Sequence, residues 1–401
     1  MAEKITQLPK TQFSGLEFTN IMEDIHALVK ENPEYNSNWD DFLNSNAGRM
    51  LTEVFAWIAD QLATRIDWNV NENFIGTATQ RSSIIKLLKL IGYKFSLPVA
   101  SQVPVTIEFS REVGNYEITP TYFEGSGQFF PKTIQGVDKK GNLRNFEAIE
   151  YDSANQKYSY KVPVVLDGSS GKAEFYFHEG KTKLKTFYST SNSGQKFIIE
   201  DTPVIANSIV VYQVIQEGTD TREIELLEVN NFLNSKAQKA ADESGTNAIP
   251  YVTNVREDNS VEIEFGSSTL LPTIDRRLPN GAELRVFYRV GGGIDGNIPR
   301  QSINTTEKPN IAGFETVVNY KNLREGIGGT DAESVEHAAY HGPLTIRTGG
   351  KTVTPEDYEI QLNAHTSILK SKSYGYNNIP SDYFDKYGTY FNPLDVVNFI
   401  V

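Results

Sequence analysis

The spacing of the apolar residues in this chain of 401 residues changes close to Pro98. Before that point apolar residues recur at intervals of three and four, which is the pattern of amphipathic helices. After it they alternate with polar residues, and Gly, Pro, Asn and Asp interrupt the chain about every ten residues, as in sandwiches and barrels. The sequence therefore predicts an α+β fold. It has a helical, bundle-like region at residues 1–97 and a β-rich, sandwich- or barrel-like region at residues 98–325, made of two or more small β subdomains.

In the helical region, a first helix is predicted from Phe18 to Lys30, before Asn32-Pro33. A third begins near Arg81 and ends at Gly92, because glycine readily takes the left-handed conformation that follows a helix. Between them lies a helix whose apolar stripe is expected to face the core. Trp57 lies beside this stripe, which consists of Leu51, Val54, Phe55, Ile58, Leu62 and Ile66.

Strands are predicted throughout the β-rich region. Residues 209–214 form an apolar run that is expected to be buried on both faces, whereas 230–246 is predicted to be a short surface helix or a loop. Further strands are expected at residues 103–109, 173–180, 197–200 and within 251–265.

A glycine-rich run, Gly291 to Gly296, formally matches the G-x-G-x-x-G fingerprint of dinucleotide-binding proteins. That fingerprint requires a helix immediately afterwards, whose N-terminus holds the pyrophosphate. Pro299 follows instead, so a flexible or tightly turned β connection is predicted here.

Residues 326–401 are predicted to form a helix, a hinge and a second helix, followed by an aromatic tail. Thr330 to Glu333 and Thr354 to Asp357 both have the composition of a capping box, in which a threonine and an acid each bond the other's backbone amide. The hinge holds Arg347 and Lys351, whose charges fit a solvated turn as well as a surface for an acidic partner. The apolar end at 396–401 is expected to pair with another chain or to precede more protein.

Composition and motifs exclude several kinds of chemistry. The chain has no cysteine, which removes disulfides and thiolate chemistry, and no G-x-S-x-G elbow. His337 and His341 are four apart on a predicted helix but lack the glutamate of an H-E-x-x-H site, so surface or interface histidines are favoured. We predict no catalytic, cofactor-binding or metal-binding residues, and a protein that is not an enzyme.

Charge and hydropathy limit the partners. The net charge of −13 argues against nucleic acid, which attracts basic surfaces, and favours protein partners. No apolar run is as long as the ~18 residues of a membrane helix, and the first ten residues lack a signal-peptide core. We expect no membrane partner.

Three blocks of the sequence resemble the baseplate J-like proteins, which are wedge components of contractile phage tails and related injection machines. Residues 50–93 resemble the family's N-terminal helical region, and residues 178–212 and 265–299 its β-rich middle. Residues 328–359 resemble its signature at Gly328, Gly329, Asp331, Glu333, Ser334, Pro343, Leu344, Arg347, Thr348, Val353, Thr354, Glu356, Asp357, Tyr358 and Glu359.

The resemblance implies a structural protein of a virion tail baseplate, assembled in the host cytoplasm. Two copies would pair in each wedge, and wedges would form a ring around a hub and transmit the contraction trigger to the sheath. Its partners would be a second copy, other wedge proteins, and hub and sheath-proximal proteins. Family members generally continue into a further C-terminal domain. The predicted interface residues are Arg49, Leu51, Phe55, Trp57, Arg347, Lys351 and Tyr358.

Two other readings stay open at this stage. A β-rich fibre or carbohydrate-binding module of a virion would fit the many aromatic residues and short strands, but not the long helical region. An enzyme of unknown type has no motif in its favour.

Overall fold

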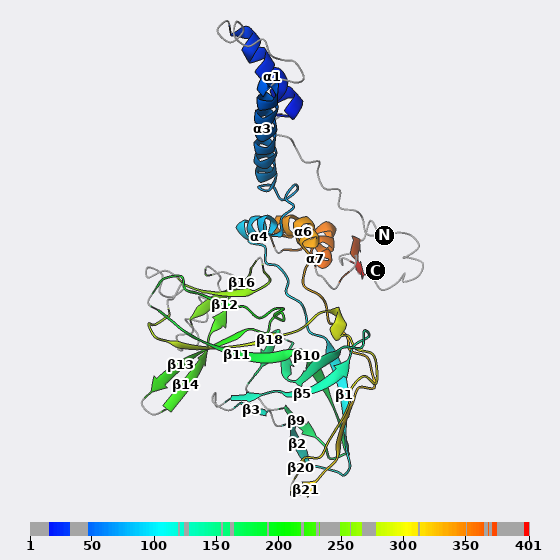
Figure 1. The fold of residues 1–401 in the computed structure, drawn as a ribbon. Helices are drawn as coiled ribbons and strands as arrows, with labels where there is room; N and C mark the ends of the chain where they lie inside the picture. The colour runs from blue at the N-terminus through cyan, green and yellow to red at the C-terminus, as the bar shows by residue number, and fades with distance from the viewer. Residues whose placement is uncertain are drawn as a thin grey trace, which may run out of the picture. The chain divides into compact units, whose positions relative to one another are not determined.

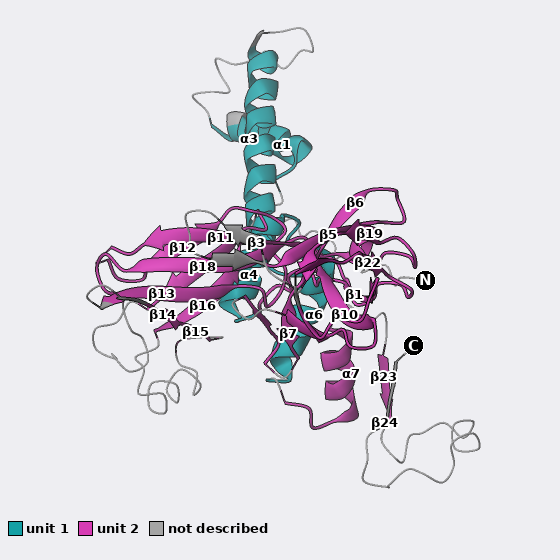
Figure 2. Cartoon of the chain, turned by 90° about the horizontal axis from the view of Figure 1, so that it is seen from below, with its two compact units in different colours: residues 1–93, 335–350 teal, residues 94–334, 351–401 magenta. Residues whose placement is uncertain are grey.

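The computed structural model divides into two compact units, residues 1–93 with 335–350 (unit 1) and residues 94–334 with 351–401 (unit 2) (Figures 1 and 2). Unit 1 is helical and unit 2 is mainly β, which confirms the predicted α+β fold. The boundaries predicted at residues 97 and 325 remain a prediction. The structure describes residues 16–32, 47–118, 121–123, 128–153, 155–160, 164–190, 192–217, 220–229, 232, 249–256, 258–266, 278–311, 313–349, 351–364, 368, 371–374 and 397–400.

Unit 1 contains α1 (Phe18–Glu31), α3 (Ala47–Asn71), α4 (Arg81–Leu90) and α6 (Val335–Arg347). The first and third predicted helices are confirmed as α1 and α4, and Gly92 follows α4 with a φ of +82°. Helices α4 and α6 are far apart in the sequence but pack together. The buried Gly342 of α6 lies against the fully buried Leu88 of α4. α1 packs alongside α3 (Figure 1).

The apolar stripe of α3 faces no core among the residues that the structure describes, so that prediction is wrong. Successive residues of a helix are about 100° apart, which puts Thr52, Ala56 and Ala63 on a different face from the stripe. These three small residues are buried, as is Asn71 at the end of the helix. The stripe residues Leu51, Val54, Phe55, Ile58, Leu62 and Ile66 are all exposed.

The first part of unit 2 is a six-stranded antiparallel sheet that almost closes into a barrel. Its two outermost strands approach each other: the Val137 amide donates to the Ser302 carbonyl at 3.4 Å, and Lys132 pairs with Glu307 at 2.7 Å. The interior contains Val103, Val105 and Ile107 of the predicted strand at 103–109. The strands, in sheet order, are β19 (Asn304–Glu307), β22 (Val318–Lys321), β1 (Gln102–Phe109), β10 (Lys172–Glu179), β6 (Leu143–Ala148) and β5 (Lys132–Val137).

The second part of unit 2 is a sandwich of two four-stranded sheets whose facing side chains share one core. Val211 and Tyr212 of β13 lie in different clusters, which confirms a strand buried on both faces. One sheet has the order β11 (Lys181–Tyr188), β18 (Glu283–Val290), β13 (Val210–Glu217) and β14 (Asp220–Glu225). The other has the order β12 (Lys196–Ile199), β17 (Val261–Phe265), β16 (Pro250–Val255) and β15 (Leu227–Glu228). The predicted helix or loop at 230–246 lies outside the described residues, apart from Phe232.

Short two-stranded pairs complete unit 2. They are β2 (Asn115–Ile118) with β9 (Val164–Asp167), β3 (Thr121–Phe123) with β4 (Gln128–Phe130), β7 (Glu150–Asp152) with β8 (Lys157–Ser159), and β20 (Asn310–Ile311) with β21 (Phe314–Glu315). Near the end of the chain, β24 (Val397–Ile400) pairs antiparallel with β23 (Ser371–Tyr374). The apolar end therefore pairs with a strand of this chain and not, as one of the two predicted alternatives had it, with another chain.

The second predicted capping box is confirmed. The Thr354 hydroxyl accepts from the Asp357 amide at 3.2 Å, and the Asp357 carboxylate accepts from the Thr354 amide at 2.8 Å, at the start of α7 (Pro355–Asn363). Pro355 is the first residue of this helix, where an amide would have no helical partner.

Candidate functional site

The predicted interface residues of α3 belong to an exposed, mainly apolar surface of unit 1. Leu51, Phe55 and Trp57 are 56%, 63% and 58% exposed. Met50 and Trp68 extend this surface around the helix and are also exposed. From Met50 to Trp68, α3 presents these side chains along about 27 Å. Contiguous exposed apolar surface of this kind is uncommon on a soluble monomer and marks interaction sites.

The charged and aromatic candidates are dispersed. Arg49 forms an ion pair with Glu53 at 3.0 Å, one turn further along α3. Arg347 is exposed in the last turn of α6 in unit 1, whereas Lys351 is exposed and Tyr358 is half-buried in unit 2. The role of these residues in an interface stays a prediction.

His337 and His341 stack on α6 with ring centroids 4.3 Å apart. Within the described residues, no group of three or more His, Cys, Asp or Glu side chains is arranged to share a metal ion.

The glycine-rich run forms a tight turn, as predicted. Gly291, Gly292 and Gly293 all have positive φ, and the single 3₁₀ turn η1 (Ile294–Gly296) follows. A side chain at Gly291 would collide with the backbone of Gly180, at 2.8 Å, so this close approach requires glycine.

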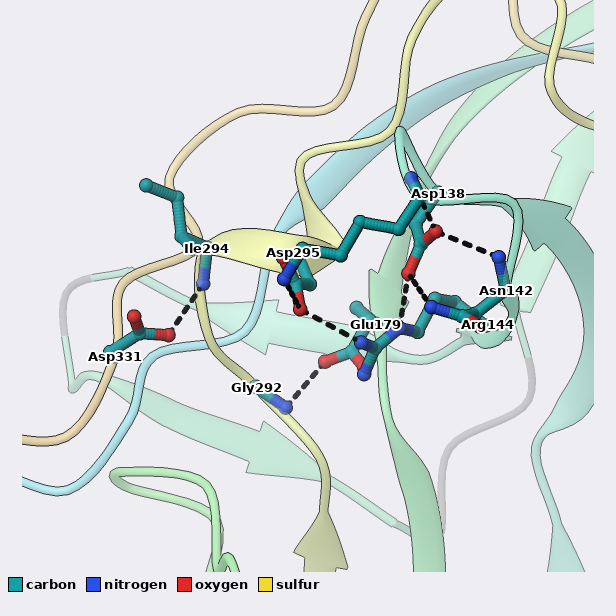
Figure 3. Close-up of polar contacts among 9 residues, drawn as sticks. Asp138, Asn142, Arg144, Glu179, Gly292, Ile294, Asp295 and Asp331 are labelled. Atoms are coloured by element: carbon teal, nitrogen blue, oxygen red, sulfur yellow. Dashed lines mark hydrogen bonds and ion pairs between the residues drawn. The ribbon is translucent and has the colours of Figure 1, made fainter.

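Two carboxylates accept hydrogen bonds from backbone amides of this turn (Figure 3). The Gly292 amide donates to the buried Glu179, and the Ile294 amide donates to Asp331 at 2.9 Å. Burial raises the pKa of the Glu179 carboxyl, against the hydrogen bond from Gly292. In a nucleotide site such amides would bind phosphate, whereas here they bind acids of the same chain.

A third acid, Asp295, lies in the turn itself and binds two basic side chains (Figure 3). Asp295 pairs with Lys140 at 2.8 Å and with Arg144 at 3.1 Å, both from the β5–β6 hairpin. Arg144 is oriented by Asp138, at 3.2 Å. Burial would raise the pKa of Asp138, but hydrogen bonds from Asn142, Arg144 and Lys140 outweigh it and lower that pKa to about 2.

The signature residues that precede α6 lie against this turn rather than starting a helix. α6 begins at Val335, so the capping box predicted at Thr330 to Glu333 is wrong. The Glu333 carboxylate instead accepts from the amide of Ser96, at 3.1 Å. The Asn297 side-chain amide accepts a hydrogen bond from the Gly329 amide at 2.8 Å and donates one to the Gly329 carbonyl at 2.9 Å. A side chain at Gly329 would lie 2.5 Å from the Gly293 carbonyl oxygen, which explains a glycine there.

A buried ion pair joins the barrel to the sandwich. Arg289 of β18 is fully buried and binds Glu147 of β6 at 3.2 Å and the His178 carbonyl of β10 at 2.9 Å. Its guanidinium also lies 4.7 Å from the Tyr158 ring. Burial, and then the charge of Arg289, lower the pKa of His178 to about 3. Glu147 also accepts from the amide and hydroxyl of Thr182 at 2.7 and 2.6 Å.

No functional role is predicted from the sequence for Glu147, Glu179 or Arg289. An arginine within the apolar strand Phe287-Tyr288-Arg289-Val290 is the one signal that could have pointed to a buried charge. The partner, 142 positions away in sequence, carries no such signal.

Comparison with solved structures gives a distant likeness. No protein-family model matches this chain, and no curated protein matches it. The chain is similar to a chain in the 6-fold symmetrised cryo-EM structure of the anti-feeding prophage baseplate, with 10% identity and a TM-score of 0.31. The match covers 90% of this chain and 59% of that chain, so this chain spans about three fifths of its neighbour. A TM-score of 0.31 is too low to establish a common fold, so function has to be inferred from this chain's own residues.

No helix among the described residues is long and apolar enough to cross a membrane.

Proposed function

We propose that this chain is a structural, non-enzymatic subunit of the baseplate wedge of a contractile tail. In this role it pairs with a second copy and with other wedge proteins to form the ring around the hub, and it passes the contraction trigger to the sheath. The resemblance of the sequence, in three ordered regions, to the baseplate J-like proteins supports this assignment. The exposed apolar surface of α3 is the structural observation that supports it.

The proposal assigns that surface to helix–helix packing between chains. Two helices pack in water mainly by removing apolar side chains from solvent, at about 25 cal/mol per Å². α3 carries large apolar side chains on its outward face and small ones, Ala56 and Ala63, on its covered face. Such a helix gains most of its burial from a partner outside the chain, as assembly subunits do.

The proposed interface also includes the charged candidates. Arg49 lies on α3, where it can add polar contacts at the rim of the apolar surface. Arg347, Lys351 and Tyr358 are proposed to contact neighbouring subunits through the segment around the end of α6 and the start of α7.

The native mass of the purified chain, measured by light scattering over a range of concentrations, tests the pairing. We expect a dimer or a larger assembly for the natural chain and a monomer for Phe55→Asp. Leu143→Asp is the matched control, because Leu143 is 65% exposed but lies in the barrel, and it should keep the natural mass. Equal masses for the natural chain and Phe55→Asp would remove α3 from the interface.

A second experiment addresses the location. An antibody raised against this chain should label the baseplate end of purified contractile particles in electron microscopy. Labelling along the fibres, or none on intact and disrupted particles, would contradict the wedge assignment.

A further inference from the structure

The exposed surface of α3 contains a second stripe beside the apolar one. The apolar stripe, here called the first stripe, includes Phe55 and is the one through which we propose that two copies pair. The second stripe lies next to it on the same helix. It consists of Met50, Trp57, Gln61, Arg65 and Trp68, and all five side chains are exposed.

The second stripe has the spacing of a helix–helix contact. Its residues are three or four positions apart when Val54, which lies between the two stripes, is counted with them. This spacing is typical of a helix that packs along one partner helix. Members of the second stripe directly precede members of the first, as Trp57 precedes Ile58, so the two stripes are about 100° apart around the helix axis.

One partner helix cannot cover both stripes. The axes of packed helices are about 8–10 Å apart. Two helices that pack on α3 in directions 100° apart would have axes roughly 14 Å from each other, so both fit without overlap. Helix α1 packs on α3 and leaves both stripes exposed. The surface of α3 therefore has room for two further helices at the same time.

The chemistry of the second stripe differs from that of the first. Tryptophan, methionine and arginine are enriched in protein interfaces, and tryptophan and arginine are frequent among the residues that contribute most to binding. The first stripe has no charged residue, whereas the second has Arg65. None of the residues three or four positions from Arg65 is acidic. A helix that covers this stripe would bury an unpaired cation unless it brings an acid of its own.

A second copy of α3 does not bring that acid. The acids of this helix are Glu53, Asp60 and Asp67, and the helical geometry places them on the side opposite to the first stripe. A copy that presented either of its stripes would bring no carboxylate to Arg65. A parallel copy in register on the second stripe would bring another Arg65 instead, and such like-charge contacts discriminate against a partner.

We propose that the second stripe binds an amphipathic helix of a different protein, whose apolar face carries an aspartate or glutamate opposite Arg65. Trp57 and Trp68 supply most of the apolar contact area, and Arg65 selects the partner by charge. The inference deepens the proposed assembly function and rests on it in one respect, namely that the first stripe pairs two copies. α3 would then contact two chemically different helices at once.

Synthetic peptides test this charge selection without the natural partner. Three helical peptides of about 21 residues have leucine at the heptad a and d positions and differ at one central a position, which is glutamate, glutamine or lysine. A central position can meet Arg65 in either orientation of the peptide. The receptor is the full chain with Phe55→Asp, in which the first stripe is disrupted, and the natural chain is a second receptor. Fluorescence anisotropy of the labelled peptides measures their affinities.

We expect the glutamate peptide to bind about tenfold or more tightly than the lysine peptide, because charges in a desolvated contact attract or repel strongly. Arg65→Glu should reverse this order, and Trp68→Ala should weaken the binding of all three peptides. Lys89→Glu is the matched control, since it reverses an exposed charge on α4, and it should leave the order unchanged. Circular dichroism checks that each variant is folded.

Three outcomes would overturn the proposal: equal affinities of the glutamate and lysine peptides, an unchanged order in folded Arg65→Glu, or no binding of any peptide to either receptor. Failure of the proposed self-pairing is distinguishable from these results. It appears as equal native masses of the natural chain and Phe55→Asp, and it leaves the order of the peptide affinities unaffected.

Discussion

Replacing Glu147 by leucine tests how strongly the barrel and the sandwich of unit 2 are joined. The substitution removes the acceptor of three hydrogen bonds, one from Arg289 and two from Thr182. Arg289 keeps its bond to the His178 carbonyl but becomes a buried cation with no described carboxylate bonded to it. Removal of one member of a buried ion pair costs about 3–5 kcal/mol, so we expect the free energy of unfolding of unit 2 to fall by about 4 kcal/mol.

Most of the expected loss of unfolding free energy comes from the buried charge of Arg289 that Glu147→Leu leaves unpaired. A double variant measures this contribution separately. Glu147→Leu with Arg289→Met leaves no buried charge at the pair, and such replacements are often neutral. The two Thr182 donors still lose their acceptor, which costs about 1–3 kcal/mol. The double variant should therefore be more stable than either single variant, with a coupling energy of about 3 kcal/mol or more.

Urea unfolding can follow the two units separately, because all three tryptophans, at positions 39, 57 and 68, belong to unit 1. Tryptophan fluorescence reports on unit 1, and circular dichroism in the β region of the spectrum reports mainly on unit 2. With a denaturant slope of about 3 kcal/mol/M, the unit 2 midpoint should fall by roughly 1.3 M in Glu147→Leu, with little change in fluorescence. A loss below about 1 kcal/mol, or additive effects in the double variant, would refute the reasoning.

Three further predictions concern packing, pH and assembly. Gly329→Ala should lower the free energy of unfolding by about 1–3 kcal/mol, because its Cβ would overlap a backbone carbonyl oxygen; Gly114→Ala, with open space at that position, should not destabilise the chain. Because the pKa of His178 is lowered to about 3 from 6.5, the unfolded chain binds the extra proton between these values, and stability falls as the pH falls through them. His178→Phe should therefore flatten the loss of stability between pH 6 and 4 by up to about 1.4 kcal/mol per pH unit, measured by urea unfolding at each pH; an equally steep loss would contradict this origin. Arg347→Glu should change unfolding by less than about 0.5 kcal/mol but prevent ring formation with partner proteins, whereas Lys139→Glu should not; ring formation at natural yield would exclude Arg347.

Local patterns predicted the parts of the fold in which neighbours in sequence decide the structure. The alternation at 103–109 gives β1, and Thr354 with Asp357 gives the start of α7. The same capping pattern failed at Thr330 because a distant amide, that of Ser96, binds the acid instead. Whether a local motif forms depends on competing contacts from distant parts of the chain, and the sequence alone does not show these contacts.

The stripe of α3 illustrates a second limit. Periodicity identified an apolar face correctly, but it cannot say whether this chain or another one covers it. The described structure covers the small-residue face around Ala56 and exposes Phe55. The candidate interface residues on α3 could be predicted from the sequence as members of an apolar face. The buried ion pair of Arg289 and Glu147 could not, because the two residues are 142 positions apart in the sequence.

The near closure of the six-stranded sheet limits aggregation when many copies of this chain are held at high concentration. A sheet edge presents unpaired amides and carbonyls, which invite strand addition and aggregation. In the barrel, β5 and β19 approach each other and share the Lys132–Glu307 pair, so these edges offer little room for a foreign strand. Many copies held close together would then meet through side chains rather than through their main-chain edges, which favours contacts of defined geometry over open-ended stacking.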